Sequence, residues 1–237
     1  MLKIVSFENE LELAKCAAGE IASLLREKPE AVLGLATGST PVETYKELCR
    51  MHKEEGLDFS RVTSYNLDEY IGLPEGHSQS YRAFMEENLF SKVNIRKECT
   101  FIPDGSWKSG EDYDAAITAS GGIDLQILGI GQNGHIGFNE PDRTLLLPTH
   151  LAALTENTRQ ANARFFNSID EVPKYAMSMG LGSIFAAKKI LLLATGASKC
   201  DAIQFLKNGL VTTDVPASLL KLHPNVTLLC DAAAFGN

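Results

Sequence analysis

The sequence predicts an α/β fold in which helices cover both faces of a mostly parallel sheet. Two observations lead to this fold class: short, almost continuous apolar runs recur along the chain, and segments with helical spacing of apolar residues separate them. Short buried strands that alternate with helices are typical of a three-layer architecture. The chain has 237 residues, of which 44% are apolar, so it is large enough to bury a sizeable core.

The first half of the chain alternates strands and helices in a regular order. We expect a short strand at 3–6 and then a helix over 8–26, because Leu13, Ala17, Ile21 and Leu24 recur along one face. The apolar run 31–36 predicts a buried strand, and Pro41 suits the first turn of a helix that continues to residue 53. The remaining elements expected here are a strand at 62–67 and a helix at 80–89.

The second half continues the same alternation with one interruption. We expect strands at 100–102, 123–128, 189–194 and 226–230, and helices at 110–120, 156–166 and 198–206. No repeat, linker or low-complexity segment divides the chain, so we predict a single domain over 1–237. Residues 142–175 hold no clear strand, and we treat them as a candidate lid segment.

Composition excludes several classes of protein. The 22 basic and 30 acidic residues give a net charge of −8, which argues against general nucleic-acid binding but allows a local pocket for a small anion. The five cysteines are scattered without a C-x-x-C pair, so we expect neither a zinc cluster nor a disulfide framework. Neither a signal peptide nor a long apolar run is evident, so we expect a cytoplasmic protein without membrane association.

The most informative segment is the glycine-rich stretch 129–141, which follows a predicted buried strand. Gly129, Gly131 and Gly134 match the dinucleotide fingerprint G-x-G-x-x-G, but that motif requires a helix that opens at its third glycine. Gly137 and Pro141 both oppose such a helix, so we reject nucleotide binding. The remaining interpretations are a proton-transfer pair of His135 with a carboxylate five residues later, or a turn with a structural histidine.

Two strand ends have the chemistry of a phosphate site. Residues 37–40 place Gly38, Ser39 and Thr40 just before a helix, whose free N–H groups bind anions, although either hydroxyl could serve only as a helix cap. Residues 195–199 repeat the Thr-Gly pattern and end at Lys199, a cation where the helix dipole disfavours it. The alternative interpretation of Lys199 is a solvated lysine without a ligand.

Arginines and carboxylates complete the list of candidates. Arg159 and Arg164 could supply further positive charge, or form a polar helix face. Asp68 and Glu69 follow another predicted strand, and only one of them is expected to enter a given pocket because consecutive strand residues point to opposite faces. A single carboxylate can act as a general base, and the alternative is a solvated loop.

Together these segments resemble the glucosamine-6-phosphate deaminase family, the glucosamine and galactosamine 6-phosphate isomerases, over nearly the whole chain. The resemblance is carried by LGLATGSTPVETY (33–45), NLDEYIG (66–72), GQNGHIGFNEP (131–141) and NTRQANARFF (157–166), with support from 172–176 and 222–224. It implies a modified Rossmann-like three-layer sandwich. It also implies conversion of glucosamine 6-phosphate and water to fructose 6-phosphate and ammonia, in amino-sugar catabolism and without a metal or redox cofactor.

The resemblance assigns a role to each candidate. Asp68 matches the base that moves a proton from C2 to C1, and His135 matches the acid and base for ring opening, with Glu140 as its partner. Asn133 falls at a third ring-opening position, which is Asp or Asn in the family. The phosphate site is matched by Gly38, Ser39, Thr40, Arg164 and Lys199. The partner implied is a small amino-sugar phosphate, and we expect a monomer or a small homo-oligomer.

The chain departs from the family at one place. Some relatives use a basic pair after the Glu-Pro dipeptide, and a longer C-terminus, to bind an N-acetylated activator between subunits. His150 and Ala152 stand where that pair is expected, and the chain ends at residue 237, so we predict no such activation. The apolar segment 145–148 is unexplained. Two alternative functions are a 6-phosphogluconolactonase, in which Glu140 would have no role, and a sugar-phosphate sensor, which would need a basic DNA-binding face.

Overall fold

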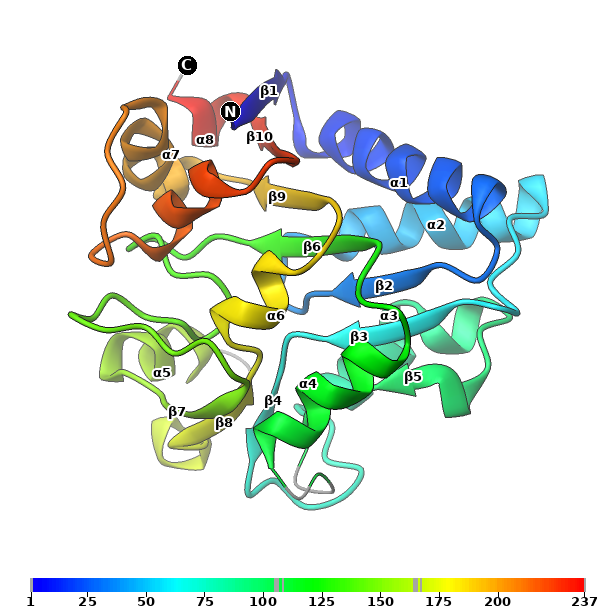
Figure 1. Cartoon of the computed structure of the whole chain (residues 1–237), viewed down its shortest axis with the longest axis horizontal. Coiled ribbons are helices and arrows are strands. Elements are labelled where there is room, and N and C mark those ends of the chain that lie inside the picture. The colour runs from blue at the N-terminus through cyan, green and yellow to red at the C-terminus, as the bar shows by residue number, and fades with distance from the viewer. Residues whose placement is uncertain (1, 105–106, 108, 164–165, 167, 237) are drawn as a thin grey trace.

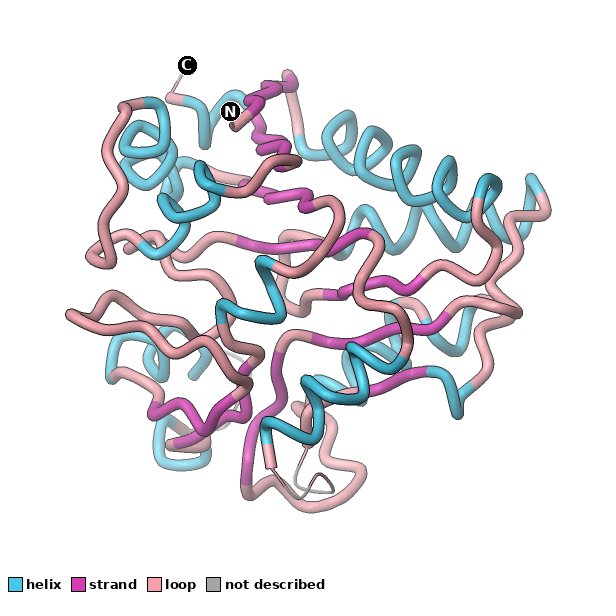
Figure 2. Tube along the Cα trace, in the orientation of Figure 1, coloured by secondary structure: helices cyan, strands magenta, loops and turns pink. Residues whose placement is uncertain are grey.

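The computed structural model describes residues 2–104, 107, 109–163, 166 and 168–236, and a parallel sheet runs through its centre (Figures 1 and 2). Every neighbouring pair in this sheet is parallel, in the order β1-β10-β9-β6-β2-β3-β5, which confirms the α/β class and the mostly parallel sheet. Its strands are β1 (Lys3–Phe7), β2 (Val32–Leu35), β3 (Thr63–Asn66), β5 (Thr100–Phe101), β6 (Leu125–Gly129), β9 (Ile190–Ala194) and β10 (Val226–Asp231).

Helices cover both faces of the sheet, as the alternation predicts. In Figure 1, α4 and α6 lie in front of the sheet and α2 lies behind it. The helices are α1 (Glu10–Glu27), α2 (Val42–Glu55), α3 (Tyr81–Asn88), α4 (Gly110–Ala119), α5 (Glu156–Asn162), α6 (Leu181–Phe185), α7 (Cys200–Lys207) and α8 (Ala232–Phe235). Short 3-10 helices are η1 (Phe90–Lys92), η2 (Lys97–Cys99), η4 (Ile169–Glu171), η5 (Ala197–Lys199) and η6 (Pro216–Leu222). None of the helices in the described ranges is both long and apolar enough to cross a membrane.

The core lies where the sheet is covered on both faces. All five residues of β9 are buried, and so are all four of β2, which explains why these strands read as continuous apolar runs. The side chains of Leu192 and Leu193 are fully inaccessible to solvent. Truncation of such a leucine to alanine typically costs about 2–5 kcal/mol of stability, because the cavity collapses only partly.

A second, antiparallel sheet was not predicted. It has the order β4-β8-β7, with β4 at Asp68–Ile71, β8 at Tyr175–Ser178 and β7 at His150–Ala153. The expectation that 142–175 holds no strand was therefore wrong for β7. Strands of four residues give too little alternation to be recognised, and their pairing partners lie far away in the sequence.

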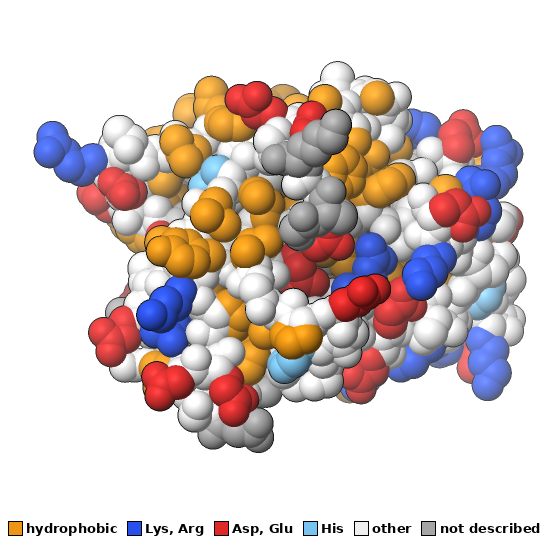
Figure 3. Space-filling view, turned by 90° about the horizontal axis from the view of Figure 1, so that it is seen from below, with side chains coloured by type: hydrophobic (Ala, Val, Ile, Leu, Met, Phe, Trp, Pro, Cys, Tyr) orange, Lys and Arg blue, Asp and Glu red, His pale blue; other side chains and the backbone are white. Residues whose placement is uncertain are grey.

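The segment 145–148 lies against the start of α6 through its backbone, and these contacts do not explain why Leu146 and Leu147 are apolar. The carbonyl oxygens of Leu146 and Leu147 accept the N–H groups of Leu181 and Gly182 at the start of α6, at 3.0 and 2.8 Å. The two backbones run so close that a Cβ on Gly180 would lie 2.1 Å from the carbonyl oxygen of Pro148. The leucine side chains themselves are 51% and 64% exposed, on a molecule whose underside gathers many apolar side chains (Figure 3).

Candidate active site

Four strand ends meet at one edge of the central sheet. Because β9, β6, β2 and β3 are parallel neighbours, their carboxyl ends lie together, at the left of Figure 1. Ligands bind at this edge in open α/β sheets. The small sheet closes the same edge, since the N–H of Met179 donates to the carbonyl of Leu67 at 2.7 Å. The predicted site segments 37–41, 66–70, 129–141 and 195–199 all begin here.

The glycine-rich loop is a tight turn and not the start of a helix. The N–H of Gly131 donates to the carbonyl of His135 at 2.9 Å, and the N–H of Gly134 donates back to Gly131 at 3.0 Å. Gly134 has a φ of 82°, which side-chain-bearing residues rarely adopt. The described structure has no helix between β6 and β7, so the geometry that a dinucleotide fingerprint requires is missing.

Gly131 is a glycine because the imidazole of His135 lies directly over its Cα. A Cβ at this position would be 2.2 Å from Cε1 and 2.3 Å from Nδ1 of that ring. Real Cβ atoms do not approach other atoms so closely, so any larger residue would displace the histidine. The glycines of this segment thus set the position of one functional side chain.

His135, Asn133 and Glu140 form a continuous hydrogen-bonded chain. The Nδ1 atom of His135 is 2.7 Å from Oδ1 of Asn133, and Nδ2 of Asn133 donates to Oε2 of Glu140 at 2.7 Å. The imidazole Nδ1 also lies 3.3 Å from that carboxylate oxygen. Because the amide oxygen can only accept, Nδ1 carries a proton and Nε2 of the neutral ring is left to accept one.

The carboxylate of Glu140 is held in its ionised form. Burial by itself would raise its pKa, but the hydrogen bond and charge of His135, with hydrogen bonds from Thr158 and Asn133, lower the pKa to about 2. Thr158 donates through Oγ1 to Oε1 at 2.6 Å. Thr158 was not among the predicted site residues, and it connects the ring-opening loop to α5.

Asp68 and Glu69 point to opposite faces of β4, as their adjacency requires. The Glu69 carboxylate accepts three backbone N–H groups, from Tyr70 and Tyr81 at 2.8 Å and from Arg82 at 2.9 Å. Two of these donors form the first turn of α3, so Glu69 fixes the start of that helix. Burial raises the pKa of Glu69, although these N–H groups oppose part of the rise. Glu69 is therefore a structural carboxylate.

Asp68 is buried beside the glycine-rich loop. Its side chain accepts no hydrogen bond from the residues that the structure describes, and a Cβ built on Gly137 would lie 3.8 Å from Oδ2. The residue is 7% exposed. Burial, and next the negative charge of Glu69, raise its pKa from 3.8 to about 8. A carboxyl with a strongly raised pKa at a strand end has the properties of a general base.

The loop before α2 is arranged as an anion cradle. Gly38 has a φ of 92°, Ser39 is exposed, and Thr40 is half-buried. Among the residues that the structure describes, no side chain caps α2, whose N-cap position is Pro41, so the alternative interpretation of Ser39 or Thr40 as its cap is wrong. The N–H of Val42, the first residue of α2, donates to the carbonyl of Ser39 at 3.3 Å, so the turn itself closes the helix start, and the exposed hydroxyl of Ser39 lies beside it.

The second Thr-Gly loop lies against the first. Oγ1 of Thr195 is 3.5 Å from Oγ1 of Thr40, and Gly196 adopts a φ of 84° and a ψ of 151°. Lys199 is half-buried at the end of η5, where α7 begins. The N–H of Gly196 is held by the carboxylate of Asp231, a strand-end residue that the sequence analysis passed over. The sequence could have indicated Asp231 as a site residue, because it directly follows the last predicted strand.

The two arginines differ in what the structure establishes. Arg159 donates to the carbonyl oxygens of Ile169 at 2.7 Å and Val172 at 3.2 Å, so its guanidinium stabilises the turn after η4. Arg159 therefore has a structural role, and does not simply form part of a solvated helix face or of the anion cradle. Arg164, the arginine predicted for phosphate binding, lies outside the described residues.

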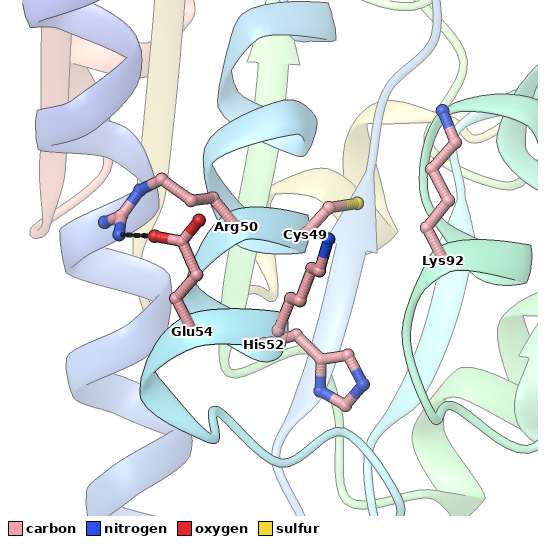
Figure 4. A pocket seen from close by; sticks show the side chains of 6 residues that line it. Cys49, Arg50, His52, Glu54 and Lys92 are labelled. Carbon is pink, nitrogen blue, oxygen red and sulfur yellow. Dashed lines mark hydrogen bonds and ion pairs between the residues drawn. The ribbon is translucent and has the colours of Figure 1, made fainter.

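Two further features bear on the site. In the described part of the chain, no group of three or more His, Cys, Asp or Glu side chains could hold a metal ion. A pocket of about 600 Å³ lies on the C-terminal half of α2 and is lined by Cys49, Arg50, His52, Lys53, Glu54 and Lys92 (Figure 4). None of the predicted site residues lines this pocket, and its arginine is engaged by Glu47, Glu54 and Glu55.

Comparison with known proteins places this geometry in a family. The family model for glucosamine-6-phosphate isomerases/6-phosphogluconolactonase matches residues 8–229. Glucosamine-6-phosphate deaminases of Clostridium perfringens (strain ATCC 13124) and Halothermothrix orenii are 52% and 53% identical, with 98% of both chains covered in each case. A solved structure of a monomeric glucosamine-6-phosphate deaminase is 44% identical, covers 99% of both chains and has a TM-score of 0.96.

A more distant solved structure shares the fold. The 6-phosphogluconolactonase from Trypanosoma brucei is 18% identical, with a TM-score of 0.76 over 100% of this chain and 98% of that chain. At this level of identity, the similarity extends to the architecture alone.

Proposed function

The chain belongs to the family of glucosamine-6-phosphate isomerases and 6-phosphogluconolactonases, and from this premise we propose that it is a deaminating isomerase of glucosamine 6-phosphate. The products are fructose 6-phosphate and ammonia, and one water is consumed. Deaminase relatives that are about half identical over nearly the full length support this choice over a lactonase. This enzyme acts in the catabolism of amino sugars.

Ring opening is assigned to the glycine-rich loop. Opening of the hemiacetal requires loss of the proton on the C1 hydroxyl and delivery of a proton to the ring oxygen. With Nδ1 bonded to Asn133, Nε2 of His135 is the atom that takes up the first proton and returns it. Glu140 is an ionised partner that orients this chain and stabilises the imidazolium formed in between.

Isomerisation is assigned to Asp68. In its ionised form the carboxylate removes the C2 proton of the open-chain aldehyde, and the C2–H electron pair forms the C1–C2 double bond. The carbonyl electron pair moves to O1, which takes a proton from the C2 ammonium, and the product is an enolamine with a hydroxyl at C1. Return of the proton to C1 converts the enolamine to a C2 imine. Water adds to this imine, and ammonia leaves as the C2 carbonyl of fructose 6-phosphate forms. A cationic amino group beside Asp68 would favour its ionised form against the pKa of about 8 in the free enzyme.

Phosphate binding is assigned to the two Thr-Gly loops. The backbone of Gly38, the hydroxyls of Ser39 and Thr40, and the ammonium of Lys199 are the proposed groups, with Arg164 as a fifth. Anchoring of the phosphate fixes the far end of the sugar, so that C1 and C2 lie at the base and the histidine. The contact between Thr40 and Thr195 supports the view that both loops serve one ligand.

The wider properties are proposed in the same way. We infer that residues 1–237 act as one catalytic domain in the cytoplasm, as a monomer or small homo-oligomer that binds no nucleic acid. No metal or redox cofactor takes part in the chemistry above. Residues 142–175 are the candidate lid. With His150 and Ala152 in place of a basic pair, the rate should show no activation by N-acetylglucosamine 6-phosphate, and a sigmoidal curve made hyperbolic by that compound would overturn this.

The single observation that carries the proposal is that Asp68 and the His135–Asn133–Glu140 chain meet at one sheet edge. A lactonase needs no base for C2 and no partner such as Glu140. The test measures ammonia release from glucosamine 6-phosphate and hydrolysis of 6-phosphogluconolactone by the same preparation. Ammonia release that is lost in His135→Ala and Asp68→Asn supports the proposal. Lactone hydrolysis without ammonia release would refute it.

A further inference from the structure

We propose that Asp231 is a positioning residue for the phosphate half of the site, an inference that rests on the proposed function. Asp231 is the last residue of β10, and its two carboxylate oxygens lie 3.1 and 3.0 Å from the N–H of Gly196, which donates to them. Oδ1 also accepts the N–H of Ala234 at 2.7 Å, so the same side chain caps α8. One carboxylate thus joins the C-terminal helix to the loop after β9.

Gly196, whose N–H Asp231 holds, also contacts the backbone of Lys199 through its carbonyl group. The carbonyl of Gly196 accepts the N–H of Lys199 at 3.1 Å, which closes the 3-10 turn that ends at the lysine. On the other side of Gly196, the hydroxyl of Thr195 meets that of Thr40 on the first loop. A shift of Gly196 would therefore move both the cation and the contact between the two loops.

Gly196 needs such support because of its backbone conformation. Its φ of 84° and ψ of 151° lie in a region that is essentially restricted to glycine, the residue that loses the most conformational freedom on folding. A Cβ built there would meet no atom within 4 Å, so backbone conformation and not crowding sets the requirement. The bond to Asp231 selects this conformation from the many that a free glycine samples.

The C-terminal helix strengthens the same arrangement. The ammonium of Lys207 on α7 lies 3.4 Å from the centre of the Phe235 ring and donates to the carbonyl of that residue at 3.0 Å. Gln204 donates to the same carbonyl at 2.9 Å. These contacts fix α8 on α7, the helix that follows directly after Lys199. The position of Asp231 is therefore set by β10 before it and by α8 after it.

The role is positional, because a carboxylate does not bind phosphate. Its charge is offset by the N–H groups of Gly196 and of the first turn of α8. Removal of the charge alone would therefore favour an anionic ligand, whereas removal of the acceptor atoms would release the loop. These two effects have opposite signs, and the difference between them makes the proposal testable.

The experiment compares Asp231→Ala with Asp231→Asn, which keeps an amide oxygen for the N–H of Gly196. The readouts are KM and kcat for glucosamine 6-phosphate and the inhibition constant of inorganic phosphate. We expect Asp231→Ala to raise KM and the phosphate inhibition constant about tenfold, the factor that corresponds to roughly 1.4 kcal/mol, or about one hydrogen bond. We expect kcat to change by less than about threefold, and Asp231→Asn to retain wild-type phosphate affinity or exceed it.

The matched control is Ser109→Ala, which removes the cap of α4, a hydrogen bond of 3.2 Å to the N–H of Asp112, away from the site. Equal phosphate affinity in Asp231→Ala and wild type would overturn the proposal, and so would an equal loss in Ser109→Ala. If Asp231→Ala does not fold, Gly196→Ala disfavours the backbone conformation that Asp231 supports and must give the same selective rise in KM. Calorimetric titration with inorganic phosphate tests the inference even if no ammonia is released, in which case the proposed function alone fails.

Discussion

Replacement of Asp68 by asparagine should abolish catalysis and, near pH 8, stabilise the protein. The carboxyl is 7% exposed and accepts no hydrogen bond from the described residues, and burial with the neighbouring charge of Glu69 raises its pKa from 3.8 to about 8. A group whose folded-state pKa is raised contributes stability that is fully present below pH 3.8 and is lost as the pH rises to about 8. The wild type therefore loses stability across that window, and the amide does not.

The magnitude follows from the width of the window. One pH unit is worth about 1.4 kcal/mol for one proton, so the interval from 3.8 to about 8 corresponds to roughly 6 kcal/mol. The free energy of unfolding of Asp68→Asn minus that of the wild type should rise by roughly 4–5 kcal/mol between pH 4 and pH 8 and then level off. A constant cost of about 1–3 kcal/mol for burying the amide shifts the whole curve without changing its slope.

The assay is urea unfolding of both proteins at half-unit intervals from pH 4 to pH 9, with far-UV circular dichroism as the probe. Glu86→Gln is the control for loss of one carboxylate, because Glu86 is only half-buried on α3 and its side chain lies outside the site. A difference curve that is flat between pH 4 and pH 8 would refute the claim that Asp68 is a destabilised buried carboxyl. A curve that falls with pH would show that the carboxylate has a stabilising partner.

Three further predictions follow from other parts of the site. Gly131→Ala should lower kcat at least about a hundredfold, because the new Cβ displaces the ring of His135, while far-UV circular dichroism stays native. Glu140→Gln should cost about 1–2 kcal/mol of unfolding free energy at pH 7, after a discount for solvent screening of a partly exposed ion pair, and almost nothing near pH 2. The lowered pKa of about 2 gives stability that is present above pH 4.5 and lost below it, and urea unfolding at both pH values measures this. Arg159→Gln should lower the melting temperature by several degrees and leave the phosphate inhibition constant unchanged, and a large rise in that constant would place Arg159 in the phosphate site after all.

The central sheet and most of its helices could be predicted because local signals determine them. The helix expected over 41–53 is found at Val42–Glu55, and the strand expected at 189–194 is found at Ile190–Ala194. The small sheet could not be predicted, because β4 pairs with β8 about a hundred residues later, and four residues carry too little pattern. The helix α6 was missed for the same reason, since its five residues include a glycine.

The site shows a similar division. Its position at the strand ends, and the pairing of His135 with Glu140, follow from sequence spacing and are found in the structure. Residue spacing left the choice between Asp68 and Glu69 open and the family resemblance favoured Asp68, whereas the structural role of Glu69 at the α3 N-terminus is visible only in the folded chain. Asp231 was passed over because its effect depends on the conformation of Gly196, which lies 35 residues earlier.

The most direct test of the central claim is release of ammonia from glucosamine 6-phosphate, measured by coupled oxidation of NADH with glutamate dehydrogenase. The wild type should release one ammonia for each fructose 6-phosphate formed, and Asp68→Asn should release none above background while it still binds inorganic phosphate. Undiminished release by Asp68→Asn would contradict the assignment of the base. Absence of release by the wild type, with phosphate bound, would contradict the proposed reaction.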